Sequence, residues 1–141
     1  MTKLALKDIS DAMKSIDICM LTTNGNDLVS RPMSNNKDVE YQGDSYFFAN
    51  GDTDVVREIA AKPGVNLAYI DQPAVFGKSL YISVSGQAEL VRDKALMKDH
   101  WTKDLDVWFK DGLDTPGLTM IHVKASSVKY WKGGDEGELK V

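Results

Sequence analysis

An Asn-Gly turn between two apolar runs constrains this chain more than any other local feature. The residues Asn24-Gly25-Asn26-Asp27 separate the runs 18–23 and 28–33, and this arrangement is the strongest short-range sign of a β-hairpin. Pro32 lies in the second run and has no backbone N–H. We therefore predict that this second strand ends, bulges or lies at the edge of a sheet there.

Further short apolar runs, each separated by turn residues, predict more strands over 46–49, 65–70, 80–85, 88–91, 118–123 and 128–131. Helical spacing of apolar residues predicts helices over 6–16, after a cap at Thr53 or Asp54, from Asp93, and over 105–109. Many short strands with inserted helices favour a mainly β fold, an antiparallel barrel with helical decoration. A parallel doubly wound sheet is the weaker alternative.

The length of the chain fits one domain. With 141 residues, 43% hydrophobic and 27% charged, the composition is that of a globular protein that can bury a core without disulfides. We expect a single domain over 1–131. The remaining residues, 132–141, are rich in glycine and acidic side chains, so they are predicted to form a flexible tail.

Charge and cysteine content exclude several classes of protein. The 17 Lys and Arg residues are outnumbered by 21 Asp and Glu and form no basic block, which argues against nucleic-acid binding. Neither a signal-peptide core nor a membrane-spanning run of about 20 apolar residues is present. Cys19 is the single cysteine, so no intrachain disulfide can form. We expect a reduced, cytoplasmic protein without membrane association.

Common catalytic motifs are absent from the sequence. No phosphate-binding glycine loop, dinucleotide fingerprint, nucleophile elbow or zinc-binding helix motif occurs. His100 and His122 are the only imidazoles; we expect His100 to pack or lie at the surface and His122 to hold a hydrogen bond. We therefore predict no metal site and assign no catalytic residue.

Two segments could bind an anion. Arg31 precedes Pro32 in a strand, where its guanidinium could hold an anion through paired hydrogen bonds; the alternative is a solvent-facing strand charge. The segment 48–53 leads from a strand through a polar turn to a helix N-terminus. Free N–H groups and the Thr53 hydroxyl could bind a phosphate there, although an ordinary helix cap gives the same pattern.

In order and spacing these pieces resemble the FMN-binding split barrels similar to pyridoxamine 5'-phosphate oxidase, and within them the general stress protein 26 branch. The resemblance covers nearly the whole chain. It rests on the segments 21–23, 28–33, 46–48, 56–59, 63–67, 81–89, 93–94, 101, 108–112 and 130–131.

The resemblance implies a six-stranded antiparallel Greek-key split β-barrel that forms a homodimer, with FMN sites at the subunit interface. It places Arg31 near the phosphate or ribityl chain, and Thr53 at the phosphate. Trp108 and Phe109 would come from the partner subunit to cover the ring. The other cofactor-binding residues that it implies are Pro32, Met33, Phe48, Ala49, Asn50 and Tyr81.

Four positions depart from the family pattern. Ala49 and Thr53 stand where relatives commonly have Thr and Ser, Lys110 replaces a usual proline, and Val55 replaces a phosphate-binding lysine. Losing one such contact costs about 1.5–3 kcal/mol, or roughly tenfold to a hundredfold in affinity. We therefore expect weak FMN binding unless Arg57 or Lys78 supplies the missing cation.

Three functions are compatible with the sequence. The first is an FMN-dependent oxidoreductase of the stress-protein type with an unknown substrate, in which the cofactor carries the electrons. The second is a non-catalytic module that binds or sequesters flavin. The third is a split-barrel dimer that has lost FMN and serves in protein interactions.

Overall fold

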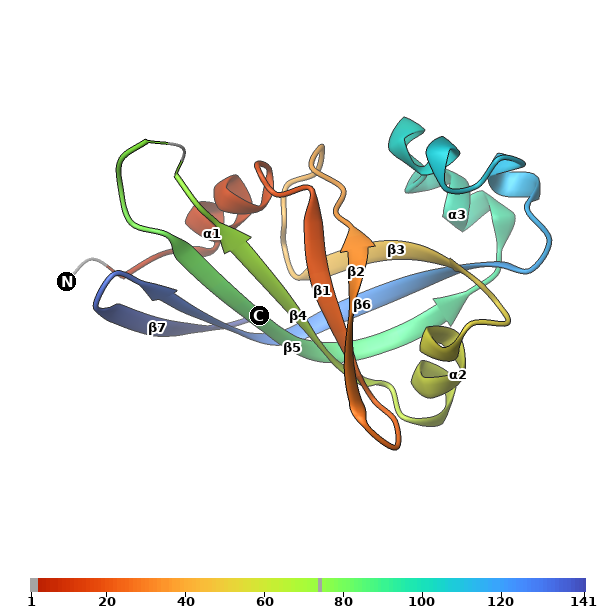
Figure 1. Cartoon of the computed structure of the whole chain (residues 1–141), viewed down its shortest axis with the longest axis horizontal. Helices are drawn as coiled ribbons and strands as arrows, with labels where there is room; N and C mark the ends of the chain where they lie inside the picture. The colour runs from red at the N-terminus through yellow and green to blue at the C-terminus, as the bar shows by residue number, and fades with distance from the viewer. Residues whose placement is uncertain (1–2, 74) are drawn as a thin grey trace.

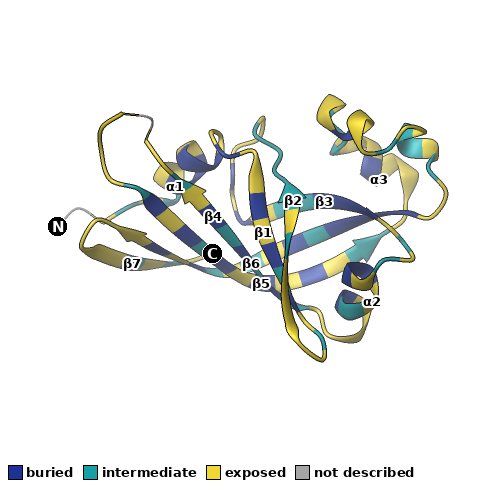
Figure 2. Ribbon diagram, viewed as in Figure 1, coloured by how far each residue is buried: buried dark blue, intermediate teal, exposed yellow. Residues whose placement is uncertain are grey.

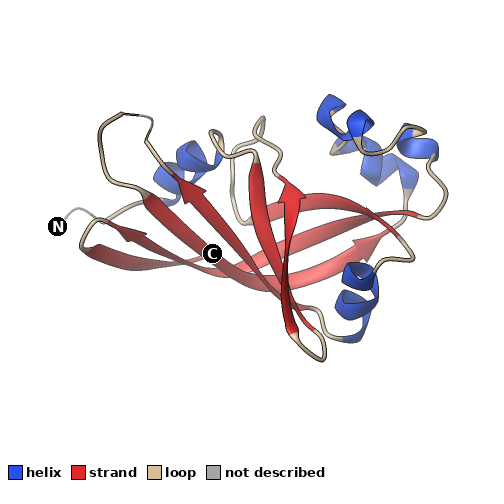
Figure 3. Ribbon diagram, in the orientation of Figure 1, coloured by secondary structure: helices blue, strands red, loops and turns tan. Residues whose placement is uncertain are grey.

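The structure, a computed structural model, describes residues 3–73 and 75–141. It is mainly β, as predicted, and all strand pairs are antiparallel. The strands run through the middle of the molecule, and the helices lie around the sheet (Figure 3). No helix within the described residues is long and apolar enough to cross a membrane.

Six strands form one continuous path in the order β2-β1-β4-β5-β6-β3, and β7 pairs with β6 beside this path (Figure 1). The pairing of β3 with β6 joins segments about 70 residues apart in the chain, as expected for Greek-key connections. The strands are β1 (Ile18–Asn24), β2 (Leu28–Ser34), β3 (Asp44–Asn50), β4 (Gly64–Asp71), β5 (Leu80–Val91), β6 (Leu118–Lys132) and β7 (Asp135–Lys140).

The predicted hairpin is confirmed. Thr23 lies opposite Val29 and Asn24 lies opposite Leu28. Strand β2 pairs only with β1 among the described strands, so the strand that contains Pro32 is an edge strand. A proline is tolerated at this place because the outer side of an edge strand needs no N–H for the sheet.

The helices are shorter than their apolar spacing predicts. The first ends at Met13, although Ile16 beyond it is still buried. The predicted helix over 105–109 is a 3-10 turn that begins earlier. The helical elements are α1 (Leu6–Met13), α2 (Asp54–Ala61), α3 (Lys94–Asp99), η1 (Lys103–Val107) and η2 (Gly112–Asp114).

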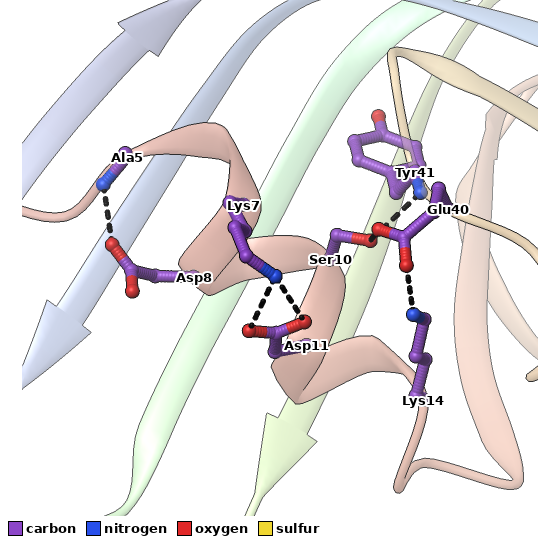
Figure 4. Close-up of polar contacts among 8 residues, drawn as sticks. All are labelled: Ala5, Lys7, Asp8, Ser10, Asp11, Lys14, Glu40 and Tyr41. Atoms are coloured by element: carbon purple, nitrogen blue, oxygen red, sulfur yellow. Dashed lines mark hydrogen bonds and ion pairs between the residues drawn. The ribbon is translucent and has the colours of Figure 1, made fainter.

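Helix α1 is fixed to the loop before β3 by polar contacts (Figure 4). The Ser10 hydroxyl donates to the Glu40 carboxylate at 3.0 Å and accepts from the Tyr41 N–H at 2.8 Å. Lys14 pairs with the same carboxylate. Since Ser10 is fully buried, these bonds satisfy its hydroxyl and tie the helix to the barrel.

Two predictions about strand ends are wrong. The runs on each side of Gly86 form one long strand, β5, and the runs 118–123 and 128–131 form one strand, β6. The register of β5 against β6 shifts between Ser85 and Gly86, and a Cβ at Gly86 would collide with the Lys124 carbonyl. Glycine thus lets two long strands bend past each other without a break.

The prediction of a flexible tail over 132–141 is also corrected, since Asp135–Lys140 forms β7 and pairs with β6 from Ser127 to Lys132. Gly137 lies against Tyr130, where any Cβ would collide with the ring. The glycine that suggested flexibility therefore permits close packing.

The buried residues lie along the strands and on parts of the helices (Figure 2), and they form two clusters. The larger cluster is formed by the inward faces of the strands together with α1 and α2. The smaller cluster lies under α3 and η1 and consists of Phe48, Met97, Leu105, Leu118 and Met120. Phe48 thus anchors the helical segment to β3, next to the candidate site.

Candidate functional site

An apolar cavity of about 280 Å³ lies where the ends of β1 and β2 meet β3 and η1. Its walls come from segments far apart in sequence, and none of the described residues that line it is ionisable. The lining residues are Ile18, Pro32, Met33, Ser34, Phe47, Phe48, Leu105, Trp108 and Phe109. A flat, largely apolar ligand is the class that such walls can hold.

Aromatic packing shapes one wall of this cavity. The Phe48 ring meets Trp101 edge-on, with the ring centroids 5.0 Å apart, and Trp101 contacts Phe109 at 5.8 Å. Trp101 Nε1–H donates to the Asp106 carboxylate at 3.0 Å. Trp108, by contrast, is 68% exposed. The wall is therefore rigid at Phe48 and open at Trp108, where a second ring can stack.

A charged cluster lies further along β2. Arg31 and Met33 project to the same face of that strand, since side chains two residues apart do so. Arg31 Nη1 donates to Thr23 Oγ1 at 2.8 Å, and Nη2 contacts Glu58 Oε1 at 3.3 Å. The Thr23 hydroxyl donates to the same Glu58 oxygen at 2.5 Å. The guanidinium is thus beside the cavity but already paired with a carboxylate of α2.

The N-terminus of α2 follows the polar turn after β3. Thr53 is the N-cap residue, and its hydroxyl donates to the Asn50 carbonyl at 2.7 Å. Arg57 bonds the Asp52 carbonyl and the Asp54 carboxylate. Arg31 reaches the same helix through Glu58, one and a half turns further along. The two segments that the sequence singled out for anion binding therefore meet at α2.

The two histidines lie on opposite faces of one tyrosine. The Tyr46 ring stacks on His100 with a centroid distance of 3.5 Å and on His122 with 4.5 Å. His122 Nε2 is 2.8 Å from Asp44 Oδ1, which confirms the expected hydrogen bond. Burial lowers the pKa of His100. This stack fixes the end of α3 to β3 and so holds η1 over the cavity.

Two other groups bear on chemistry. Burial raises the pKa of the Cys19 thiol to about 12, so this cysteine is not a nucleophile at neutral pH. Across residues 3–73 and 75–141, no three His, Cys, Asp or Glu side chains gather as metal ligands. The groups that the structure places at the site itself are the apolar walls and the charges around α2.

Residues 5–141 match the model of the family described as pyridoxamine 5'-phosphate oxidase like. The chain belongs to this family. The family resemblance inferred from the sequence is therefore confirmed.

Two known proteins are similar to the chain over most of its length. Protein bli-3 of Neurospora crassa is 25% identical over 136 residues, which is 89% of this chain and 63% of that protein. The chain thus spans less than two thirds of this relative. A Clostridium acetobutylicum protein related to general stress protein 26 superposes with a TM-score of 0.82 at 20% identity, over 96% of this chain and 94% of that one.

Two further solved structures share the split-barrel fold and differ in the ligand they are named for. The general stress FMN/FAD binding protein of Xanthomonas citri has a TM-score of 0.72 and 22% identity, over 96% of this chain and 95% of that one. A heme binding protein of Mycobacterium smegmatis has a TM-score of 0.72 and 14% identity, over 99% of this chain and 60% of that one. At these identities the likeness establishes the fold alone.

Five of the residues expected to bind the cofactor of this oxidase-like family line one cavity. They are Pro32, Met33, Phe48, Trp108 and Phe109. The resemblance implied that the last two come from a partner subunit. Within one chain, Trp108 and Phe109 already line the same cavity as Met33 and Phe48.

The other expected residues lie outside this cavity. Ala49 is buried in the core and Asn50 is exposed at the end of β3. Tyr81 lies at the start of β5, beside Ile70 and Trp131, on the outer face of the sheet. Tyr81 is therefore not among the residues that line this cavity.

The position of the missing family lysine is buried. Val55 is 6% exposed and packs in the main core. Of the two substitute cations suggested, Arg57 lies on α2, where it bonds the Asp52 carbonyl and the Asp54 carboxylate. Lys78 is at the other end of the molecule, because its side chain lies against Gly133 in the turn between β6 and β7.

Sequence reasoning missed three residues of the charged region. Thr23 could have been found, because the predicted hairpin register places it diagonally across from Arg31. Glu58 could not have been found in this way, because its contact with Arg31 depends on how α2 packs against the hairpin. Arg92 is the third: it donates to Thr119 Oγ1 at 3.3 Å and its guanidinium approaches Gly51, in the turn before α2.

Proposed function

We propose that this chain binds FMN, with the isoalloxazine ring in the apolar cavity and the phosphate toward Arg31 and the N-terminus of α2. One observation carries the proposal: an aromatic-walled cavity and a half-buried arginine lie on the same face of one strand. A flat apolar ring and an anionic tail need this combination. The name of the Xanthomonas citri neighbour supports flavin as the ligand.

The residues of the chain would divide the work of holding the cofactor. Phe48, Trp108 and Phe109 would contact the ring, and these apolar side chains would shield it from water. Arg31 and Thr53 would bind the phosphate. Bound FMN would supply electron transfer with a substrate, which makes an oxidoreductase of the stress-protein type the proposed activity.

A non-catalytic flavin-binding role is the second candidate. It is favoured by the absence of any ionisable side chain among the described residues of the cavity wall, since a general acid or base would have to come from elsewhere. Reduction of FMN-loaded protein by NADH or NADPH, followed with common electron acceptors, separates the two roles. Turnover supports the enzyme, and bound flavin without turnover supports the binding module.

Titration of the purified protein tests the cofactor itself. We expect FMN fluorescence to be quenched with saturation, and Trp108→Ala to weaken binding without unfolding the chain, because Trp108 is mostly exposed. Hemin is titrated in parallel, given the heme-binding neighbour. Saturable hemin binding without flavin binding would overturn the proposal.

We propose further that a second copy of the chain covers the outer face of the sheet and completes the site as a homodimer. Exposed apolar residues continue across neighbouring strands of this face: Ile18, Met20, Ile70, Tyr81 and Trp131. Ile18 also lines the cavity, so a copy docked here would adjoin the ligand. In light scattering, Ile70→Lys should give a monomer and Lys3→Ala should leave a dimer. A monomeric unmodified protein would contradict the proposal.

A further inference from the structure

The contact between Arg31 and Glu58 lies where the proposed function needs a free cation. The Arg31 side chain is 18% exposed and that of Glu58 is 26% exposed, and Thr23 between them is fully buried. Among the described residues, Thr23 and Glu58 accept from two of the five N–H donors of the Arg31 guanidinium. The arginine is therefore still reachable by a ligand, but its charge is largely neutralised.

The packing of α2 holds the Glu58 carboxylate in this place. Val56 and Ile59, on either side of it in sequence, are buried in the core and fix the helix against the sheet. Gly25 leaves room for the side chain, because a Cβ at that position would lie 2.9 Å from Glu58 Cδ. The carboxylate thus reaches Arg31 because the helix and the hairpin turn place it there.

A carboxylate and a phosphate oxygen bind the same guanidinium edge through the same charge-assisted hydrogen bonds. A phosphate that approaches Nη2 must therefore displace Glu58 or lie beside it with repulsion between like charges. We infer that Glu58 is an internal competitor for the phosphate of the ligand, which lowers affinity for phosphorylated flavin and has to move away on binding. This inference rests on the proposed function.

Comparison of FMN with riboflavin, which lacks the phosphate, tests the inference. Glu58→Gln keeps the shape of the side chain and removes its charge, so we expect FMN to bind about tenfold more tightly and riboflavin to bind as before. Glu89→Gln is the matched control, since it removes one exposed carboxylate that pairs with Lys124. If Glu58→Gln leaves the preference for FMN over riboflavin unchanged, the pair only ties α2 to the hairpin and the inference is wrong.

A second measurement does not depend on flavin. The side-chain Nε–H resonance of Arg31 is followed by NMR while inorganic phosphate is added, and it should respond at about tenfold lower phosphate in Glu58→Gln than in the unmodified protein. If no flavin binds to either protein, the proposed function fails. The phosphate titration then still tests whether Glu58 competes with phosphate for Arg31. Equal phosphate responses would overturn the inference. Should Glu58→Gln not fold, Glu58→Asp, which draws the charge back, replaces it in both experiments.

Discussion

The cavity and the charged cluster beside it are built in different ways. One side of the cavity belongs to the hydrophobic core, since Phe48 is buried and packs against Trp101. The charged cluster, in contrast, is satisfied within the chain, since Arg31 pairs with Glu58 and Thr23. Core packing therefore prepares the apolar half of the site for a ligand, whereas internal pairing makes the polar half resist one.

The largest expected effect comes from breaking the apolar half. Phe48→Ala should lower the free energy of unfolding by about 3–5 kcal/mol, because it leaves a cavity in the core under α3 and η1. Urea denaturation measures the loss. Phe76→Ala, which changes an 89% exposed ring, should stay within about 0.5 kcal/mol. Equal effects of the two substitutions would mean that Phe48 does not support the cavity.

Breaking the charged half should cost less. Arg31→Met leaves the half-buried Glu58 carboxylate without its cation, so we expect a loss of about 1–2 kcal/mol in the free energy of unfolding. Lys37→Met, which removes the cation of the more exposed pair with Asp17, is the control and should change stability by less than about 0.5 kcal/mol. A loss no larger than that of the control would show that the cluster contributes little to stability.

Placing a lysine at Val55, where relatives have a phosphate-binding lysine, tests whether the charged half of the site limits FMN affinity. In Val55→Lys the buried stem must extend along α2 to bring its ammonium group to the turn at Thr53. We expect FMN to bind about tenfold more tightly, with some loss of stability from replacing a core residue. Val56→Lys is the control on the same helix and should gain no affinity. Unchanged FMN affinity in Val55→Lys would place the phosphate elsewhere.

The smallest effect concerns pH. Burial lowers the pKa of His100, although Asp99 and Asp44 oppose the shift. Between this pKa and the ordinary value of about 6.5 the unfolded chain binds more protons, so stability should fall as the pH drops through that range. We expect the difference in Tm between about pH 7.5 and about pH 5.5 to be smaller in His100→Phe, which keeps a ring against Tyr46. If the variant shows the full difference, another group is responsible.

Local signals in the sequence predicted most of the strands and turns, whereas the split-barrel topology came from the family resemblance. The Asn24-Gly25 turn, the edge position of Pro32 and the cap at Thr53 follow from backbone chemistry that neighbouring residues determine. Local signals failed where a contact between distant segments reversed their meaning. From the sequence, Gly86 predicted the end of a strand and Gly137 a flexible tail. In the structure these glycines let the backbone pack closely against Lys124 and Tyr130.

The candidate site could be predicted only in part, because some of its contacts join segments that are distant in the sequence. Met33, Phe48 and Phe109 were found through family resemblance, and the structure brings them to one cavity. Lys78 was proposed as a cation from its charge alone, and its place at the far turn could not be read from neighbouring residues. The contact of Glu58 with Arg31 likewise depends on how α2 docks on the hairpin.

The sequence by itself determined most of the strands and turns, although not β7, and the presence of an arginine and aromatic rings suited to a flat anionic ligand, because turn chemistry and side-chain alternation act over a few residues. The tertiary structure decided which of these groups meet. It joined Trp108 to Met33, buried Val55 and gave Arg31 a carboxylate partner, because the energies of packing and of ion pairs depend on distances that the folded chain alone sets.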